Sequence, residues 1–245
     1  MSNLPLPLAM LTQADWHTWL AMFWFMIILE LPRYTLSGLA VFVCSFFRRT
    51  PPTRADRAYL DSLKLSVVVA GHNEADSMWK CLRSLGEQTR RIDEIIVVDD
   101  GSTDGMRDMI NAIRRAGHID VALANQVRCG KAASCNMAFN FSSGDIIINL
   151  DADSSYDRDA IAKLIEPFCD PKVGATTGSI GVRNFRLSAV TAWQSIEYVT
   201  SIALGKRVLE MFDMVACASG AFSAFRREAV DQMASWRAGP AKTST

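Results

Sequence analysis

The chain has 245 residues, of which 49% are hydrophobic and 21% charged, and its 26 basic side chains balance its 26 acidic ones. These proportions are typical of a globular protein and exclude extensive disorder. A net charge of zero argues against a broadly basic surface and leaves room only for a local basic patch, so we expect no nucleic-acid partner.

Residues 1–15 are predicted to form an N-terminal tail. The first predicted element is an apolar transmembrane segment over residues 16–47. It is longer than the roughly 20 residues that a bilayer-spanning helix needs. Glu30 and Arg33 interrupt this segment, and on a helix they lie close enough to pair. Two interpretations stay open. We favour one kinked span, and the alternative is two short spans joined by a turn at Leu31–Tyr34.

The distribution of basic residues predicts how this segment is oriented. Residues 1–18 contain no Lys or Arg, whereas four arginines follow the segment directly: Arg48, Arg49, Arg54 and Arg57. By the positive-inside rule, the rest of the chain then lies in the cytoplasm, at the cell (inner or plasma) membrane. We therefore expect membrane lipid among the partners of the chain.

After a linker over residues 48–63, short apolar runs alternate with stretches of helical periodicity. This alternation predicts an α/β fold, with a mostly parallel sheet covered by helices on both faces. Strands are expected at 65–70, 94–98, 120–124, 145–150, 173–182 and 222–224, and helices at 76–85, 104–116, 131–141, 158–168, 187–212 and 227–234. This domain spans residues 64–236, and a divergent tail spans residues 237–245.

The six cysteines form neither a CxxC pair nor a zinc-ligand spacing. We expect them to be buried small apolar residues rather than members of a disulfide framework.

Polar residues follow three of the predicted strands at the point where each strand ends. They are Asn73-Glu74 after the first strand, Asp99-Asp100 after the second, and Asp151 with Asp153 after the run DIIINL. Ligands of parallel α/β sheets bind outside the carboxyl ends of the strands. Each of these residues alone is compatible with a plain turn or a helix cap, but all three groups at one edge indicate a site.

Two features of this edge favour a phosphorylated ligand. Asp151 and Asp153 are alternate residues of an extended segment, so both carboxylates can point to one Mg²⁺ or Mn²⁺ ion. Gly130-Lys131 opens a predicted helix, where free backbone N–H groups, the helix dipole and an ammonium coincide. The sequence matches neither a Walker A loop nor a dinucleotide fingerprint.

Five blocks carry a more specific resemblance: SVVVAGHNEA, IIVVDDGSTD, GKAASCN, NLDAD and SGAFSAFRREAV. In this order and spacing they resemble the family 2 glycosyltransferases of GT-A fold. Within that family the chain resembles membrane-bound synthases of cellulose, hyaluronan, chitin oligosaccharides and poly-N-acetylglucosamine. The resemblance implies transfer of a sugar from a UDP-sugar donor, with inversion, to a glycan or lipid-linked acceptor.

The resemblance also implies residue roles. It places the nucleotide against Asn73, Glu74 and Asp100, with Asp99 supporting the turn, and the diphosphate beside Lys131 and Asp151. It assigns the Mg²⁺ or Mn²⁺ ion to Asp151 and Asp153, and the acceptor sugar to Ser219, Gly220 and Ala221. The family often has Pro and Tyr where this chain has Gly71 and His72.

The family's catalytic base is an Asp in a Glu-Asp motif that follows a stretch resembling Ala234-Ser235-Trp236. No Asp or Glu follows Asp231 in this chain. We therefore expect an incomplete catalytic domain that binds donor but is inactive alone. The alternatives are a lipid-phosphate sugar transferase and a non-catalytic nucleotide-sugar-binding fragment.

Overall fold

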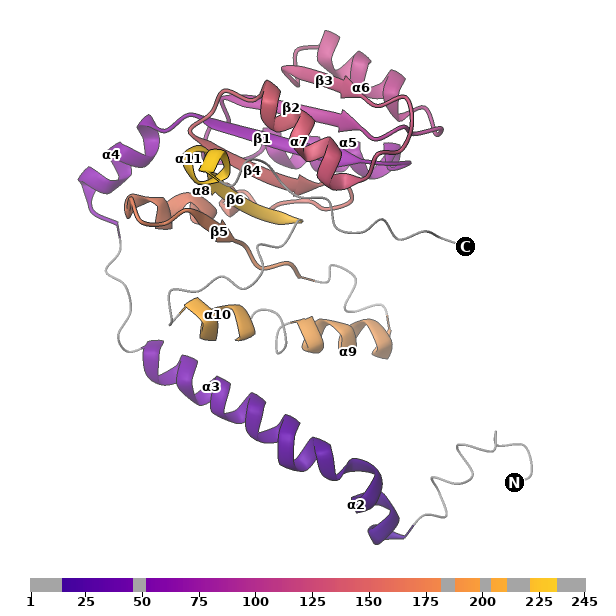
Figure 1. Cartoon of the computed structure of the whole chain (residues 1–245), viewed down its shortest axis with the longest axis vertical. Coiled ribbons are helices and arrows are strands. Elements are labelled where there is room, and N and C mark those ends of the chain that lie inside the picture. Colours follow the sequence, from indigo (N-terminus) through magenta and orange to yellow (C-terminus); the bar gives the residue numbers. More distant parts are fainter. Residues whose placement is uncertain (1–14, 46–51, 182–187, 199–203, 211–220, 233–245) are drawn as a thin grey trace. The chain divides into compact units, whose positions relative to one another are not determined.

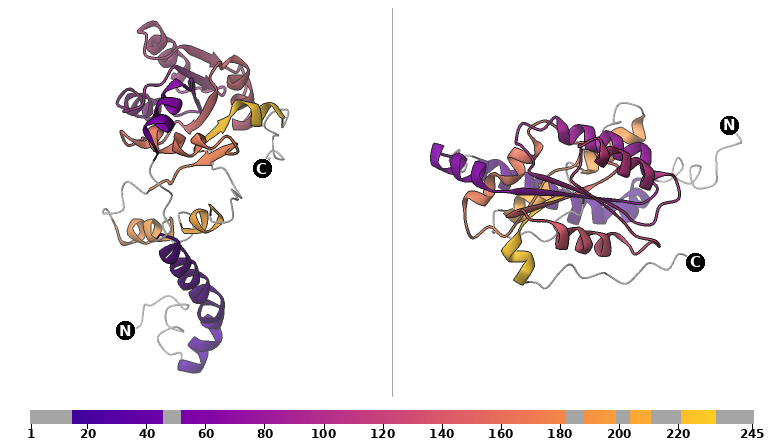
Figure 2. Two further views of the ribbon diagram at one scale, coloured as in Figure 1. Left: turned by 90° about the vertical axis from the view of Figure 1, so that its left-hand side faces the viewer. Right: turned by 90° about the horizontal axis from the view of Figure 1, so that it is seen from above.

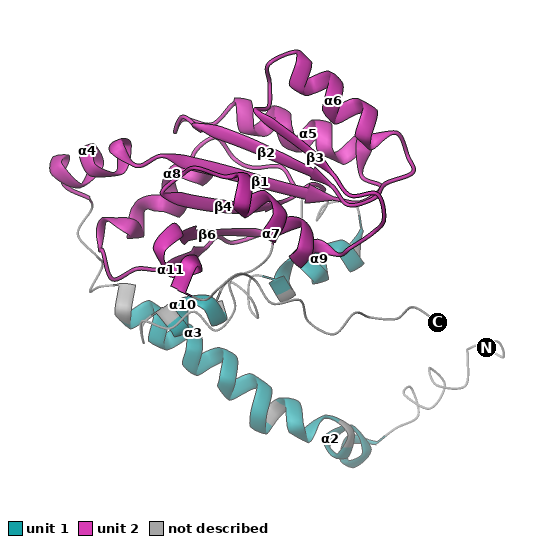
Figure 3. Ribbon diagram, turned by 45° about the horizontal axis from the view of Figure 1, so that its top comes forward, with its two compact units in different colours: residues 1–49, 181–214 teal, residues 50–180, 215–245 magenta. Residues whose placement is uncertain are grey.

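The structure is a computed structural model, and it describes residues 15–45, 52–181, 188–198, 204–210 and 221–232 (Figure 1). The chain divides into two compact units, residues 1–49 with 181–214 and residues 50–180 with 215–245 (Figure 3). In their described parts, the first unit is helical and the second contains the sheet.

The first unit begins with a helix that runs from Trp16 to Ser45 without a turn. It consists of α2 (Trp16–Phe25), a π-helical segment (Met26–Glu30) and α3 (Leu31–Ser45). The π-helical segment lies just before Pro32, which has no N–H to offer to the preceding turn, and Leu31 N–H donates to Met26 O five residues back. Leu31–Tyr34 is therefore helical, and of the two interpretations the structure matches the single continuous helix.

Within this helix, the expected pair between Glu30 and Arg33 is present, with 3.5 Å between the carboxylate and guanidinium atoms. Residues Phe23–Val43 are long and apolar enough to cross a membrane, as judged by length and composition. The predicted helix over residues 187–212 contains α9 (Ala189–Glu197) and α10 (Leu204–Glu210), and α10 contacts α3.

The second unit contains a six-stranded sheet in the order β3-β2-β1-β4-β6-β5. The first four strands in this order run parallel; β6 is antiparallel to its neighbours β4 and β5, so the edge strand β5 runs in the same direction as the first four. The strands are β1 (Leu65–Gly71), β2 (Glu94–Asp99), β3 (Val121–Ala124), β4 (Ile146–Asp151), β5 (Ala175–Thr177) and β6 (Phe222–Arg226). The mostly parallel sheet predicted from the alternation of elements is thus confirmed.

Helices cover both faces of this sheet because alternate strand residues point in opposite directions. Val67 and Val69 pack with residues of α5, α6 and α8 in one apolar cluster, whereas Val68 and Ala70 pack with α7 in the other. Figures 1 and 2 show α7 and α11 on one side of the sheet and α5 and α6 on the other. The helices are α4 (Arg54–Ser62), α5 (Ala75–Gly86), α6 (Met106–Arg115), α7 (Lys131–Phe141), α8 (Ala160–Ile165, continued by a 3₁₀ turn, Glu166–Cys169) and α11 (Arg227–Gln232).

Two expectations need correction. Of the strand expected over residues 173–182, the described part is only Ala175–Thr177, which pairs with β6 alone and is followed by one more backbone hydrogen bond, from Gly178 N–H to Phe222 O. Cys81 and Cys135 are buried as expected, but Cys169 is only half-buried and Cys129 is exposed. Cys129 belongs to the loop before α7, where its N–H donates to Asp100 and its thiol donates to Val127 O at 3.3 Å.

Candidate active site

The register of the central strands brings the predicted polar strand ends level with one another. Gly71 pairs with Asp99, and Ala70 pairs with Asp151, so β1, β2 and β4 end side by side. The structure therefore places the residues after these strands at one carboxyl edge. This is the position at which parallel sheets bind their ligands.

Asp99 is turned inward and holds the turn after β2. Its side chain is fully buried, pairs with Arg107 of α6 at 3.3 Å, and accepts a hydrogen bond from Ser102 N–H at 2.9 Å. A buried carboxylate requires such partners. Asp99 is thus placed to support the loop that carries Asp100.

Asp100 fixes the loop that leads into α7. Its two carboxylate oxygens accept hydrogen bonds from the N–H groups of Cys129 and Gly130, at 2.9 and 2.8 Å, and from the Asn125 amide at 2.8 Å. Burial opposes ionisation, but these donors outweigh it and lower the pKa of Asp100. Asp100 therefore orients the N–H groups at the start of α7.

The end of β1 is joined to the loop after β2. Asn73 adopts the left-handed conformation, with φ of 55°. Its side chain accepts from Thr103 N–H at 2.8 Å, and its own N–H donates to Ser102 Oγ at 2.9 Å. His72 Nδ1 lies 2.9 Å from Asp100 O. A side chain at Gly71 would lie 2.8 Å from both Ala152 and Glu74, so this position leaves no space for one.

The charged centre of the site contains three carboxylates and one ammonium. Lys131, the first residue of α7, forms an ion pair with Asp151 at the end of β4. Burial raises the pKa of Glu74, and the negative charge of Asp153 raises it further. Burial lowers the pKa of Lys131, which the nearby carboxylates Asp153 and Glu74 partly offset. Glu74, Asp153 and Lys131 therefore lie close enough to influence one another, and the Lys131 ion pair adds Asp151 to the group.

This centre fits a divalent cation that takes few protein ligands. No group of three or more His, Cys, Asp or Glu side chains arranged for a metal ion occurs among the described residues. Mg²⁺, however, is commonly held by one or two carboxylates and completed by phosphate oxygens and water. Asp153 is exposed on the turn after β4, and Asp151 already faces a cation, the Lys131 ammonium. The donor set therefore suits a metal that arrives with a diphosphate.

The acceptor side of the predicted site is described only in part. Ala221 precedes β6, and its carbonyl oxygen accepts from Asp151 N–H at 3.2 Å. Ser219 and Gly220 lie outside the described residues, as do residues 233–245, where the sequence approaches the expected position of the base.

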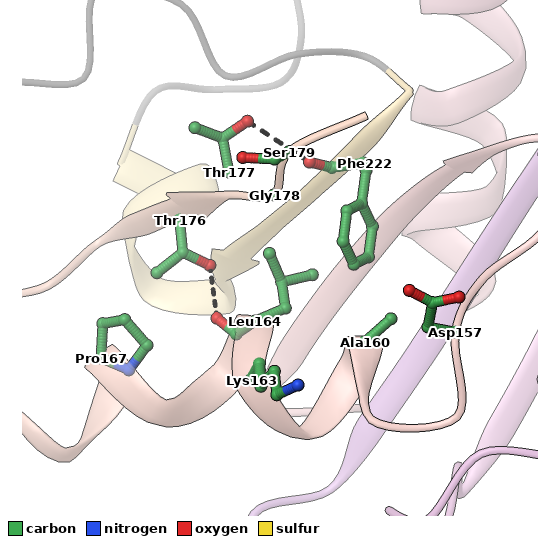
Figure 4. A pocket seen from close by; sticks show the side chains of 10 residues that line it. All are labelled: Asp157, Ala160, Lys163, Leu164, Pro167, Thr176, Thr177, Gly178, Ser179 and Phe222. Atoms are coloured by element: carbon green, nitrogen blue, oxygen red, sulfur yellow. Dashed lines mark hydrogen bonds between the residues drawn. The ribbon is translucent and has the colours of Figure 1, made fainter. Parts of the chain in front are cut away.

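A separate pocket of about 280 Å³ lies beside this edge, between α8, β5 and the start of β6. None of the predicted site residues lines it. Figure 4 shows the Phe222 ring projecting into the pocket near Leu164, with Asp157 at its rim. The Phe222 ring also contacts the ring of Tyr156, with 5.1 Å between centroids, which links the pocket wall to the segment after Asp153.

Three residues at this edge were not predicted from the sequence. Asn125 and Arg107 hold Asp100 and Asp99, respectively, but they are surface-type residues whose partners only the folded structure reveals. Tyr156 contacts both Asp151 and Ala221. A single aromatic residue in the mostly polar run DADSSYD was the signal that could have indicated it.

Comparison with known proteins gives a family match over the part of the chain that contains the predicted site residues. Residues 66–233 match the sequence profile described as glycosyl transferase family 2. The poly-beta-1,6-N-acetyl-D-glucosamine synthases of Staphylococcus aureus and Staphylococcus epidermidis are 32% and 31% identical to this chain over 173 residues. The aligned region covers 70% of this chain but only 42% of each relative.

A solved structure supports the fold. The mannosyltransferase from Pyrobaculum calidifontis, in complex with GDP-Man and Mn²⁺, matches with a TM-score of 0.60 and 22% identity. The match covers 86% of this chain and 58% of the mannosyltransferase. At this identity the comparison establishes a shared architecture.

Proposed function

The chain belongs to glycosyl transferase family 2, and from this premise we propose that it supplies the donor-binding domain of an enzyme that transfers a sugar from a UDP-sugar to a saccharide acceptor, with inversion. The observation that carries the proposal is the ion pair between Lys131 and Asp151, with Glu74 and Asp153 in the same electrostatic environment, at the carboxyl edge of the sheet. This arrangement suits a diphosphate that is bound together with a divalent cation.

The diphosphate is expected to lie at the start of α7. Lys131 supplies an ammonium there, and Asp100 holds the N–H groups of Cys129 and Gly130 in the adjoining loop. A helix N-terminus and an ammonium together stabilise phosphate oxygens. In the proposed reaction, these groups stabilise the negative charge that grows on the UDP leaving group.

Asp151 and Asp153 would hold the Mg²⁺ or Mn²⁺ ion. When bound, the ion neutralises charge on the departing diphosphate. Asp151 would then exchange its pairing with Lys131 for the ion, and Lys131 would turn to a phosphate oxygen. Asn73 and Glu74, at the end of β1, would form one wall of the nucleotide pocket.

The relatives suggest which donor and acceptor to test first. Their name specifies a polymer of N-acetyl-D-glucosamine, so UDP-N-acetylglucosamine is the donor we propose and a growing saccharide the acceptor. A lipid-phosphate acceptor is the competing outcome. The apolar helix over Phe23–Val43 supports a location at the membrane, with the sheet-containing unit in the cytoplasm.

The test uses the gene at its natural locus, either unchanged or carrying Asp153→Asn. Membranes are incubated with radiolabelled UDP-N-acetylglucosamine and Mn²⁺, and the label is followed into polymer and lipid fractions. We expect label in the polymer fraction with the unchanged gene and loss of that label with Asp153→Asn. Label in the lipid fraction alone would identify a lipid-phosphate acceptor, and equal incorporation by both strains would contradict the proposal.

A further inference from the structure

The Tyr156 hydroxyl lies at the end of the β4–β6 pairing, beside Asp151 and Ala221. The last residue pair of β4 and β6 is Leu150 with Phe222, so Asp151 and Ala221 are the next residues along each chain. The hydroxyl accepts from Asp151 N–H at 3.2 Å and lies 3.0 Å from Ala221 O, to which it can donate. Asp151 N–H also donates directly to Ala221 O at 3.2 Å, so the phenol reinforces a backbone contact between these two residues.

Other contacts hold the Tyr156 side chain in this position. Its ring packs against the Phe222 ring, and its backbone N–H donates to Ser84 Oγ of α5 at 3.1 Å. Burial raises the pKa of the phenol, so the hydroxyl keeps the proton that it donates. A phenylalanine at this position would preserve the ring packing and lose only the hydroxyl.

The Tyr156 hydroxyl contacts two residues with different proposed roles, one on the metal side of the site and one on the acceptor side. Asp151 begins the Asp151-Ala152-Asp153 segment, and Ala221 ends the segment that the family resemblance associates with the acceptor. The loss of one hydrogen bond is small in free energy, but a shift of a ligand carboxylate by a fraction of an ångström is costly to a metal site. The hydroxyl is therefore placed to affect binding more than folding.

We propose that Tyr156 is a positioning residue, whose hydroxyl fixes the Asp151 backbone against Ala221 and so sets the Asp151 and Asp153 carboxylates for the metal–diphosphate group. This inference rests on the proposed function. Tyr156 itself is not proposed to touch a reacting atom. Its effect passes through the backbone of the two residues that it joins.

The experiment compares Tyr156→Phe with the original chain and with Tyr59→Phe, a control that removes an exposed phenol from α4. UDP binding is measured by calorimetry at several Mn²⁺ concentrations and with chelator, and melting temperatures are recorded in parallel. We expect Tyr156→Phe to weaken Mn²⁺-dependent UDP binding about fivefold, which corresponds to roughly 1 kcal/mol for the lost hydrogen bond. Binding in chelator and binding by Tyr59→Phe should match the original chain.

A purely structural role would lower the melting temperature of Tyr156→Phe and leave its Mn²⁺-dependent affinity unchanged, which would overturn the inference. If Tyr156→Phe does not fold, Ser84→Ala gives the same test. It removes the acceptor of Tyr156 N–H, and an Mn²⁺-dependent affinity equal to that of the original chain would also overturn the inference. A failure of the original chain to bind UDP with Mn²⁺ would instead contradict the proposed function.

Discussion

The ammonium of Lys131 forms an ion pair with the carboxylate of Asp151, and this pair joins the first residue of α7 to the last residue of β4. These two groups, both proposed to lie beside the diphosphate, thus partly neutralise each other. The pair prevents the acidic edge from carrying its full negative charge. Binding of a cation and a diphosphate together would replace the pair with two new ones.

This exchange predicts the effect of Lys131→Met, which keeps the aliphatic stem and removes the charge. UDP should bind at least tenfold more weakly in the presence of Mn²⁺, because a charge-assisted hydrogen bond to phosphate contributes about 1.5–3 kcal/mol. Calorimetry measures the change. Lys80→Met, an exposed lysine on α5, is the control, and equal weakening by both variants would show only a general charge effect.

Asp100 predicts a specific dependence of stability on pH. Because its pKa is lowered in the folded protein, the stability it contributes is present above its unfolded-state pKa, about 3.9, and is lost as pH falls through the folded value. Asp100→Asn turns an amide donor toward the N–H groups of Cys129 and Gly130, so we expect a loss of about 2 kcal/mol at pH 7.

Urea denaturation at several pH values checks this prediction. The difference in unfolding free energy between the original chain and Asp100→Asn should be largest at neutral pH and shrink below about pH 4. Asp108→Asn, at an exposed position on α6, should show little difference at any pH. A difference for Asp100→Asn that does not change with pH would contradict the assigned hydrogen bonds.

Gly178 directly follows β5, and the Phe222 ring occupies the space that a Cβ would fill. Gly178→Ala should therefore destabilise the protein by about 1–3 kcal/mol through overpacking. Gly86→Ala is the control, because no atom lies within 4 Å of a Cβ at that position, and it should be neutral or slightly stabilising. The melting temperatures of both variants, measured by thermal denaturation, test this prediction.

The proposed membrane orientation is tested by cysteine labelling in intact cells, in a background carrying Cys129→Ala. A membrane-impermeant thiol reagent should label Ser2→Cys and spare Ser62→Cys, because the arginines after residue 47 favour the cytoplasm. Both positions should react after the cells are permeabilised. Labelling of Ser62→Cys in intact cells would reverse the orientation.

Much of the sheet could be predicted from the sequence because its strands are buried on both faces and read as short apolar runs. Every residue of β1 is buried, and its sequence contains the apolar run SVVVA, which predicts such burial. Strand β5 was overestimated because its length depends on Gly178 meeting Phe222, a contact between residues 44 positions apart (222 against 178). The antiparallel direction of β6 likewise depends on the path of the chain and not on local sequence.

The site residues that directly follow a strand and carry a charge could be predicted from the sequence. Residues whose role depends on a hydrogen-bond partner far away in the sequence could not. Asp100 and Asp151 follow strands and were found by position alone. The sequence could not show that Asp100 binds the loop before α7 with both oxygens, since its partners lie 25 to 30 residues away. Tyr156 was missed for the same reason, because its role depends on the approach of Ala221 to Asp151.

We propose that the acidic edge binds a nucleoside diphosphate through a divalent cation. The most direct measurement is calorimetric titration of UDP into the original chain, Asp153→Asn and the control Asp108→Asn, with Mn²⁺ and with chelator. We expect tight binding only with Mn²⁺, a loss of at least tenfold in Asp153→Asn, and no loss in Asp108→Asn, because a neutral amide cannot balance the charge of the ion. Equal UDP affinity with chelator, or in Asp153→Asn, would contradict the claim.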